Sequence, residues 1–213
     1  MVVRVIAKNL LKHTPFYPMH VGYYAKKLAI KYPHLKISAY DIKGSKLWDK
    51  HPKNVNFKQM DLLKLEAENC YDFVLSIDVL EHIPGNIRIL KNIYKALKPN
   101  GYFYLHMPSR VQKRIFPEKL FREFEDWTRE EHIGEMYKLE ELVGIITSAG
   151  FEVIEARRTF DFWGKFAWEV DRITDRSPFL KIISMPLLKF LSQLDVKFSR
   201  EGNGILILSR KNP

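Results

Sequence analysis

The chain of 213 residues has a single cysteine, Cys70, so an intrachain disulfide and a cysteine-based metal cluster are excluded. It has no run of 18 apolar residues, so no helix is expected to cross a membrane. The first seven residues are charged at Arg4 and form too short a run for a secretory signal. These absences predict a cytoplasmic protein. The length and the 46% apolar content predict one α/β domain with an appendage.

Acidic residues are scarce at the start of the chain. Residues 1–60 hold 12 Lys/Arg and 2 Asp/Glu, so this quarter carries the whole formal net charge of +10. Such a segment is either a solvated lysine-rich face or a docking surface for phosphate, acidic lipid or nucleic acid.

A short apolar run at 73–77 is bounded by Asp72 and Asp78. Runs of this kind are typical of parallel strands that are buried on both faces. The turn signal at 97–101 is followed by a second apolar run at 102–107. Strand, helix, turn and strand predict a βαβ unit, because two parallel strands need a crossover connection.

The same reasoning gives the remaining elements. Strands are predicted at 35–40, 55–60, 151–160 and 204–209, with the last two as an antiparallel pair at the sheet edge. Helices are predicted at 23–32 and 138–149. The apolar spacing of residues 1–12 favours an amphipathic helix. The alternative, a first strand at 2–7, would leave a loop of 12 or more residues before the next helix.

Two long segments interrupt this pattern, at 109–137 and at 161–203. Ligands of open α/β sheets bind outside the carboxyl ends of the strands, and either segment could cover that edge. We therefore expect a single domain over 1–213, with a lid at 109–137 and a helical insertion at 161–203. Basic and aromatic residues of the lid suit either an acceptor pocket or the packing face of a helix: Arg110, Lys113, Arg114, Phe116, Phe121, Phe124 and Trp127.

Residues 178–198 are too apolar for a free surface. Pro186 is expected to split them into two short helices. We expect burial against the sheet or in a homodimer, and the alternative is peripheral contact with a membrane interface. Lysines at 181, 189 and 197 could mark the wet side of these helices.

Acidic residues follow three of the predicted strands. Asp41 could accept two hydrogen bonds from a ribose diol, or it could merely cap a turn. Asp61 could contact a ligand or act as the N-cap of a following helix. Asp78, Glu81 and His82 form a tight acid/base cluster.

If Val79 opens a helix, Asp78 and His82 share a face, and His82 could take a proton from an acceptor. The alternative is that His82 hydrogen-bonds a neighbouring loop. No metal site is predicted.

The phrase Asp78-Val79-Leu80-Glu81-His82-Ile83 after the fourth strand, with Leu97-Lys98-Pro99-Asn100-Gly101 before the fifth, resembles the class I S-adenosylmethionine-dependent methyltransferases of the type 11-like branch. The resemblance runs from about residue 22 to residue 157. It implies a Rossmann-like fold with a mostly parallel sheet, an antiparallel last strand and a helical insertion. It also implies S-adenosyl-L-methionine as cofactor and a small-molecule, lipid-linked or sugar-linked acceptor.

The resemblance assigns roles to individual residues. Asp41 would hold the adenosine ribose, and Asp61 would face the adenine amino group. Ser76 and Ile77 would hold the methionine end, and Asp78 with His82 would assist deprotonation of the acceptor. The remaining cofactor contacts would come from His20, Gly22, Ile42, Met60 and Leu62.

The glycine-rich cofactor loop of the family, G-x-G-x-G, is not intact. Its place is taken by Phe16-Tyr17-Pro18-Met19-His20-Val21-Gly22, which keeps only the last glycine. Glycines there let the backbone approach the ligand and adopt unusual dihedrals. The loop is therefore remodelled, the chain is a degenerate relative that lost cofactor binding, or its native start differs.

A nucleic-acid-directed methyltransferase is a further alternative. Basic residues and a tryptophan after the second strand could supply phosphate and stacking contacts: Lys43, Lys46, Trp48, Lys50 and Lys53. No N-P-P-Y-like phrase follows the fourth strand, so methylation of a base amino group is not favoured.

Overall fold

The computed structural model describes residues 2–7, 21–42, 48, 51–175, 177–194 and 201–213. Seven strands form one sheet in the order β3-β2-β1-β4-β5-β7-β6. Their bounds are β1 Val2–Ala7, β2 Lys36–Asp41, β3 Val55–Gln59, β4 Tyr71–Ile77, β5 Leu97–Pro108, β6 Phe151–Thr159 and β7 Gly204–Lys211. β1 to β5 pair in parallel, and β7 is antiparallel to both β5 and β6. The predicted α/β fold with an antiparallel last strand is confirmed.

The prediction of a helix over residues 1–12 is wrong, because β1 is a strand at the centre of the sheet. Its sequence, Val-Val-Arg-Val-Ile-Ala, is rich in β-branched residues, which favour strands. Backbone pairing with β2 on one side and β4 on the other overrides the weak helical spacing. The segment that links β1 to the next helix lies outside the described residues.

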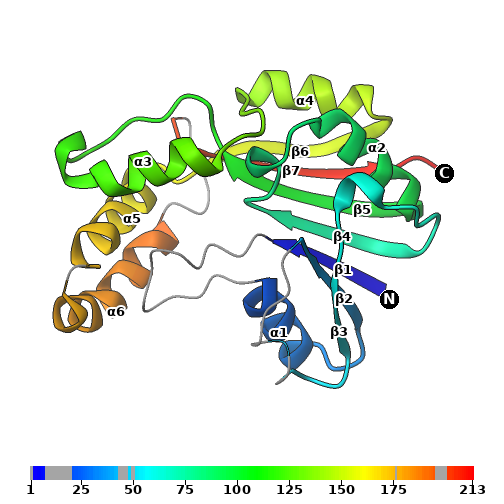
Figure 1. The fold of residues 1–213 in the computed structure, drawn as a ribbon, viewed down its shortest axis with the longest axis horizontal. Helices are drawn as coiled ribbons and strands as arrows, with labels where there is room; N and C mark the ends of the chain where they lie inside the picture. Colours follow the sequence, from blue (N-terminus) through cyan, green and yellow to red (C-terminus); the bar gives the residue numbers. More distant parts are fainter. Residues whose placement is uncertain (1, 8–20, 43–47, 49–50, 176, 195–200) are drawn as a thin grey trace.

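Helices cover the two faces of the sheet (Figure 1). On one face, α2 (Asn86–Ala96) and α4 (Leu139–Ser148) bury a core that includes Phe103, Leu105 and Met107 of β5. On the other face, α1 (Val21–Lys31) buries Ala25 and Ala29. Successive residues of a strand point to opposite faces, so Tyr104 and His106 of β5 lie on the α1 side.

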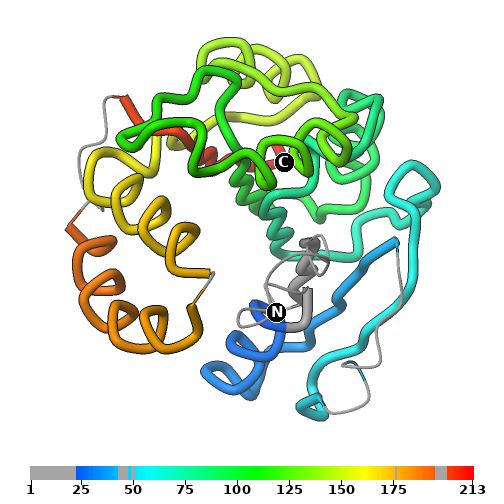
Figure 2. The backbone as a smooth tube through the Cα atoms, turned by 60° about the vertical axis from the view of Figure 1, so that its left-hand side comes forward, coloured from blue at the N-terminus to red at the C-terminus, as the bar shows by residue number. Residues whose placement is uncertain are grey.

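The two long segments form a helical lobe. The first contains η4 (Glu118–Phe121) and α3 (Arg122–Glu131), and the second contains α5 (Phe162–Thr174) and α6 (Pro178–Leu194). Figure 2 shows α5 and α6 side by side. The fully buried carboxylate of Glu169 on α5 accepts hydrogen bonds from the amides of Ile115 and Phe116, which ties the two segments together.

α6 differs from expectation in two ways. It is one helix of 17 residues with Pro186 inside it, and not two short helices. Proline removes one backbone donor, and packing against α5 compensates for that loss. Most of its large apolar side chains are exposed: seven of them are 53–71% exposed, namely Phe179, Leu180, Ile182, Ile183, Leu187, Phe190 and Leu194.

The buried side of α6 carries a lysine that was expected to face water. Lys181 is 2% exposed, and its ammonium group pairs with Asp175 and lies 3.5 Å from Asp171, both on the α5 side. A buried ammonium needs such partners. Within the described residues, no helix is long and apolar enough to cross a membrane.

Candidate functional site

Three side chains form a hydrogen-bonded chain at the carboxyl edge of the sheet. Asp78 follows β4, His106 lies near the end of β5, and Thr159 ends β6. The imidazole Nδ1 of His106 lies 2.9 Å from Asp78 Oδ1, and its Nε2 lies 3.0 Å from Thr159 Oγ1. Because the carboxylate only accepts, Nδ1 carries a proton, and in the neutral imidazole Nε2 accepts from the threonine hydroxyl. In that form Nε2 could receive a proton.

The backbone fixes the chain of hydrogen bonds. Asp78 has a left-handed φ of 50°, which short polar residues tolerate, and its N–H donates to the carbonyl of His106 at 3.0 Å. Gly204, the first residue of β7, leaves room for the two other side chains. A Cβ there would lie 2.4 Å from Thr159 Oγ1 and 2.9 Å from His106 Nε2.

The negative charge of Asp78 contributes to the raised pKa of two tyrosines, Tyr24 and Tyr104. Burial raises the pKa of the Tyr24 phenol to about 12, and the negative charge of Asp78 adds to the shift. Burial also raises the pKa of Tyr104, with Arg157 opposing and Asp78 adding. Tyr24 lies on α1, so this helix borders the same site as β4 and β5.

The predicted cofactor residues at β2 and β3 come together. Asp41 is the last residue of β2 and is 7% exposed, and its carbonyl accepts from the N–H of Met60 at 2.8 Å. Ile42 beside it is 52% exposed. Asp61 is the N-cap of η2 (Leu62–Lys64), and its carboxylate accepts from Leu63 N at 2.9 Å. The capping contact named as the alternative for Asp61 is therefore present, and Leu62 is buried in the core.

The end of β4 supplies an orphaned polar group. Ser76 is fully buried, and its hydroxyl has no hydrogen-bond partner among the described residues, an unusual state for a buried donor. The neighbouring Ile77 is half-buried. Gly22 is the second residue of α1, whose N-terminus follows β1. His20 lies outside the described residues.

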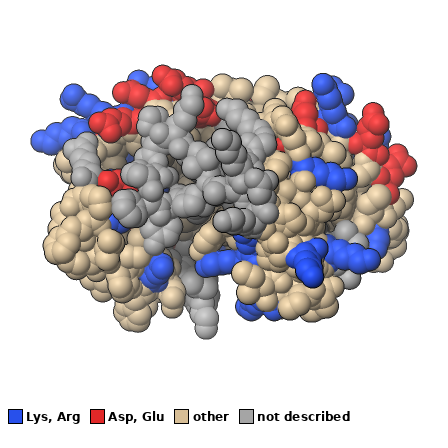
Figure 3. Space-filling view, turned by 60° about the horizontal axis from the view of Figure 1, so that its bottom comes forward, with Lys and Arg blue, Asp and Glu red and all other residues tan. Residues whose placement is uncertain are grey.

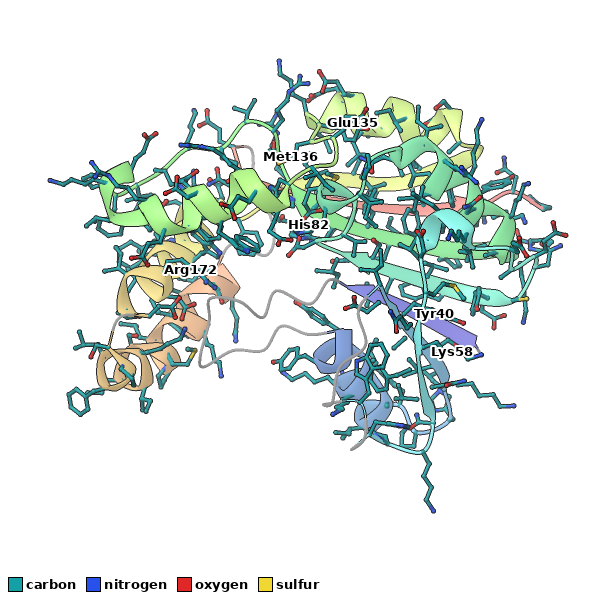
Figure 4. The ribbon with its side chains drawn as sticks, in the orientation of Figure 1. Tyr40, Lys58, His82, Glu135, Met136 and Arg172 are labelled. Atoms are coloured by element: carbon teal, nitrogen blue, oxygen red, sulfur yellow. The ribbon has the colours of Figure 1, made fainter. Side chains whose placement is uncertain are left out.

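The structure turns His82 toward the lid. The helix expected from Val79 is the single turn η3 (Leu80–His82), and the longer helix starts only at Asn86. The buried ring of His82 places Nδ1 2.9 Å from the carbonyl of Glu131, the last residue of α3. Figure 4 shows this ring between the end of β4 and α3. Asp78 is hydrogen-bonded to His106 instead, so the helix face that the sequence suggested for Asp78 and His82 does not form.

The aromatic and basic residues of the lid pack against α5. The guanidinium group of Arg114 pairs with Glu125 and lies 5.1 Å from the ring of Phe121 and 4.9 Å from that of Trp168. Phe124 meets Trp168 edge to face at 4.9 Å. These contacts support the packing alternative for this part of the lid.

The family model of a methyltransferase domain matches residues 20–156, well over half of the chain. The chain belongs to this methyltransferase family. The predicted relationship to class I S-adenosylmethionine-dependent methyltransferases is confirmed.

The names of similar proteins state different reactions. A ubiquinone biosynthesis O-methyltransferase of Rickettsia prowazekii is 23% identical over 134 residues, covering 62% of this chain and 53% of its own. A Haemonchus contortus phosphoethanolamine N-methyltransferase 2, solved with S-adenosyl-L-methionine, gives a TM-score of 0.65 at 21% identity, over 99% of this chain and 49% of its own.

The [4+2]-cyclase SpnF gives a TM-score of 0.59 at 15% identity, over 98% of this chain and 74% of its own. The two solved structures show the fold alone, and the cyclase illustrates that a fold does not fix the reaction. This chain spans about half the length of the O-methyltransferase and of the N-methyltransferase.

A groove of about 550 Å³ lies on the β6 side of this methyltransferase domain. It is lined by Val111, Lys113, Leu139, Glu140, Ala156, Arg157, Arg158 and Glu201. Asp41 and Asp61 follow β2 and β3, at the other end of the strand order, so this groove is not the predicted cofactor site.

His106, Thr159 and His132 were not predicted as site residues from the sequence. His106 carried one usable signal: it alternates with the apolar residues Leu105 and Met107, so it points away from their core. Nothing local marked Thr159 or His132, because their partners are about 50 residues away in sequence. Of the proposed nucleic-acid contacts, Trp48 stacks on Phe57 at 5.4 Å, and Lys43, Lys46 and Lys50 lie outside the described residues.

Proposed function

We propose that this chain is an S-adenosylmethionine-dependent methyltransferase that methylates a hydroxyl group of a small or lipid-linked acceptor. The observation that carries the proposal is the Asp78–His106–Thr159 chain at the carboxyl edge of the sheet, in a member of the methyltransferase family. Ligands of such sheets bind at this edge.

The residues present fit the cofactor. Asp41 offers a largely buried carboxylate at the end of β2, where a ribose diol can bind, and Ser76 offers a buried hydroxyl that has no partner in the described part of the chain. S-adenosylmethionine, when bound, supplies a methyl group activated by a sulfonium centre. Catalysis by the protein then rests mainly on alignment of the acceptor, which can be worth several kcal/mol of the barrier.

His106 would act as the base. The acceptor hydroxyl would take the place of Thr159 as donor to Nε2, and its proton would pass to that atom as the new C–O bond forms and the C–S bond breaks. Asp78 would stabilise the resulting imidazolium through Nδ1–H. Positioned bases of this kind typically contribute about 10²–10⁴-fold to a rate.

Cofactor binding is tested by calorimetry with S-adenosylmethionine and its demethylated product. We expect Asp41→Ala to weaken binding by about 1–3 kcal/mol, or roughly 5–150-fold, as for the loss of a charged hydrogen-bond partner. Asp72→Asn is the matched control, since Asp72 lies at the amino end of β4 and pairs with Lys98 at 3.0 Å. If the wild type does not bind even millimolar cofactor, the chain is a degenerate relative and the proposal fails.

The reaction is tested by following formation of the demethylated cofactor with phenolic acceptors and with phosphoethanolamine. His106→Asn should lower kcat about 10²-fold or more at neutral pH while cofactor affinity stays constant. Thr159→Val should retain activity, because the hydroxyl of Thr159 would hydrogen-bond Nε2 of His106 only in the free protein and would be replaced there by the acceptor hydroxyl. Equal kcat in the His106→Asn variant and the wild type would remove His106 from the mechanism, and turnover of the amine alone would reassign the acceptor.

The exposed face of α6 favours a lipid-linked acceptor at an anionic bilayer. In Figure 3 most residues at the lower left are uncharged and several lysines and arginines lie at the lower right, on the side that carries α6 and α1 in Figure 1. Exposed lysines on α1, β3 and the loop before it include Lys27, Lys31, Lys53 and Lys58. A protein surface that combines an apolar helix face with basic residues has the composition that binds anionic lipid surfaces.

Cosedimentation with vesicles of phosphatidylglycerol and phosphatidylcholine tests this contact. We expect binding that falls as salt rises, and its loss in a Leu187→Asp/Phe190→Asp variant. Ser192→Asp is the control, because Ser192 is an exposed polar residue of the same helix. A change from dimer to monomer in sedimentation equilibrium would instead make the face a homodimer interface. Salt-sensitive binding to RNA without vesicle binding would favour the nucleic-acid alternative.

A further inference from the structure

Glu81, His82 and His132 converge at the end of β4. One ligand atom of each, a carboxylate oxygen or a ring nitrogen, lies within 4.8 Å of the others. Glu81 Oε1 and His82 Nε2 are 3.7 Å apart, and the rings of His82 and His132 meet edge to face at 4.7 Å. The three residues come from two segments, η3 and the loop after α3, so the tertiary fold assembles them.

The cluster is held in place by its surroundings. Because the carbonyl of Glu131 accepts the hydrogen bond from His82 Nδ1, the proton lies on Nδ1 and the lone pair of Nε2 points toward the cluster. A backbone carbonyl bonded to the second ring nitrogen is a common feature of histidine metal ligands.

The loop that carries His132 is also fixed on η3. Gly134 donates its N–H to the carbonyl of Glu81 at 2.9 Å, and a Cβ on Gly134 would lie only 2.3 Å from the carbonyl oxygen of Leu80. Only glycine allows this approach. The spacing between the two histidines is therefore set by backbone contacts as well as by their own side chains.

Burial and ligand type point to a cation. The side chains of Glu81 and His82 are each 1% exposed, and buried carboxylates are paired with positive charge or coordinate metals. Two imidazoles and one carboxylate form the donor set of many three-ligand zinc sites, which keep a fourth position open. Imidazole favours first-row transition ions over Mg²⁺ and Ca²⁺.

We propose that Glu81, His82 and His132 bind a divalent transition-metal ion, with Zn²⁺ as the representative. Ligand atoms of a tetrahedral site with bonds of about 2.0–2.1 Å lie roughly 3.4 Å apart. The 3.7 Å between Glu81 and His82 is close to this value, and side-chain rotation closes the rest. The ion would join the lid segment to η3. If the proposed function holds, its open position would also polarise an acceptor oxygen.

Metal binding is tested on the full chain after dialysis against a chelator. Calorimetry with Zn²⁺ should give one site per chain, and Mg²⁺ should bind far more weakly. Zinc at 100 times its Kd should raise the Tm by about 5–10 °C, from mass action on the folded state. Co²⁺ should give the intense visible absorption of a four-coordinate ion.

Variants locate the site. Glu81→Gln and His132→Asn should each weaken Zn²⁺ binding at least 100-fold and abolish the cobalt absorption, while His34→Asn, at an exposed histidine, should change neither. If one variant fails to fold, the other still decides. The proposal is overturned by less than about 0.1 Zn²⁺ per chain after reloading, or by binding that both variants retain. Zinc binding without cofactor binding would support this site and reject the proposed function.

Discussion

Glu169 offers the sharpest test of how the two segments of the helical lobe are held together. Its carboxylate is fully buried on α5. One oxygen accepts from Phe116 N at 2.8 Å, and both oxygens lie 3.0–3.1 Å from Ile115 N. Two backbone donors of the lid therefore depend on one side chain. Replacing it with alanine leaves both amides without their acceptor.

The expected cost follows from these two bonds. A hydrogen bond to a charged group is worth about 1.5–3 kcal/mol, so Glu169→Ala should destabilise the lid by about 3–6 kcal/mol. Glu169→Gln keeps one acceptor oxygen without charge and should lose roughly half as much. Glu130→Ala, at an exposed glutamate of α3, should stay within about 0.5 kcal/mol of the wild type.

Native-state hydrogen exchange measures this effect at the two amides themselves. In Glu169→Ala, exchange at Ile115 and Phe116 should accelerate by at least about 100-fold, because local opening sets the rate. Amides in β5 should keep their protection unless the whole domain is destabilised. Unchanged exchange at both amides, in a folded variant, would refute the role of Glu169 as the link between the two segments.

Three further predictions follow from single contacts. Gly204→Ala should cost about 1–3 kcal/mol in urea unfolding, because its Cβ would displace the side chains of Thr159 and His106. The raised pKa of Tyr24, about 12 against 10.0 in the unfolded chain, gives stability that is complete below pH 10 and is lost between pH 10 and 12. In alkaline unfolding, Tyr24→Phe should reduce that loss. Asn54→Ala should cost about 1–3 kcal/mol by chemical denaturation, since the amide of Asn54 donates to backbone carbonyls at both ends of the α1–β2 connection.

Local sequence patterns predicted most of the strands of the sheet. The apolar run that became β4 and the acidic residues after the strands were visible in the sequence and lie at the expected places. The turn expected at 97–101 is wrong as a boundary, because β5 already begins at Leu97. The correct signals survive because burial on both faces acts over a few residues. Asp41, Asp61 and Asp78 were recognisable on this basis alone.

Where two signals competed, the tertiary structure decided. Residues 2–7 had an acceptable helical spacing, and only pairing with β2 and β4 makes them a strand. Pro186 was expected to end a helix, and contact with α5 keeps α6 continuous around it. In both cases long-range contacts outweigh a local preference of about 1–3 kcal/mol.

The hydrogen-bond partners of the site residues could not be predicted from the sequence. Asp78 pairs with His106, 28 residues away, and His82 meets the end of α3 at Glu131, 49 residues away. Strand order and register determine these partners, and no local periodicity in the sequence reveals either of them. The sequence determined the βαβ pattern and the methyltransferase family. The packing of the lid, β5 and β6 onto the end of β4 decided which groups meet there.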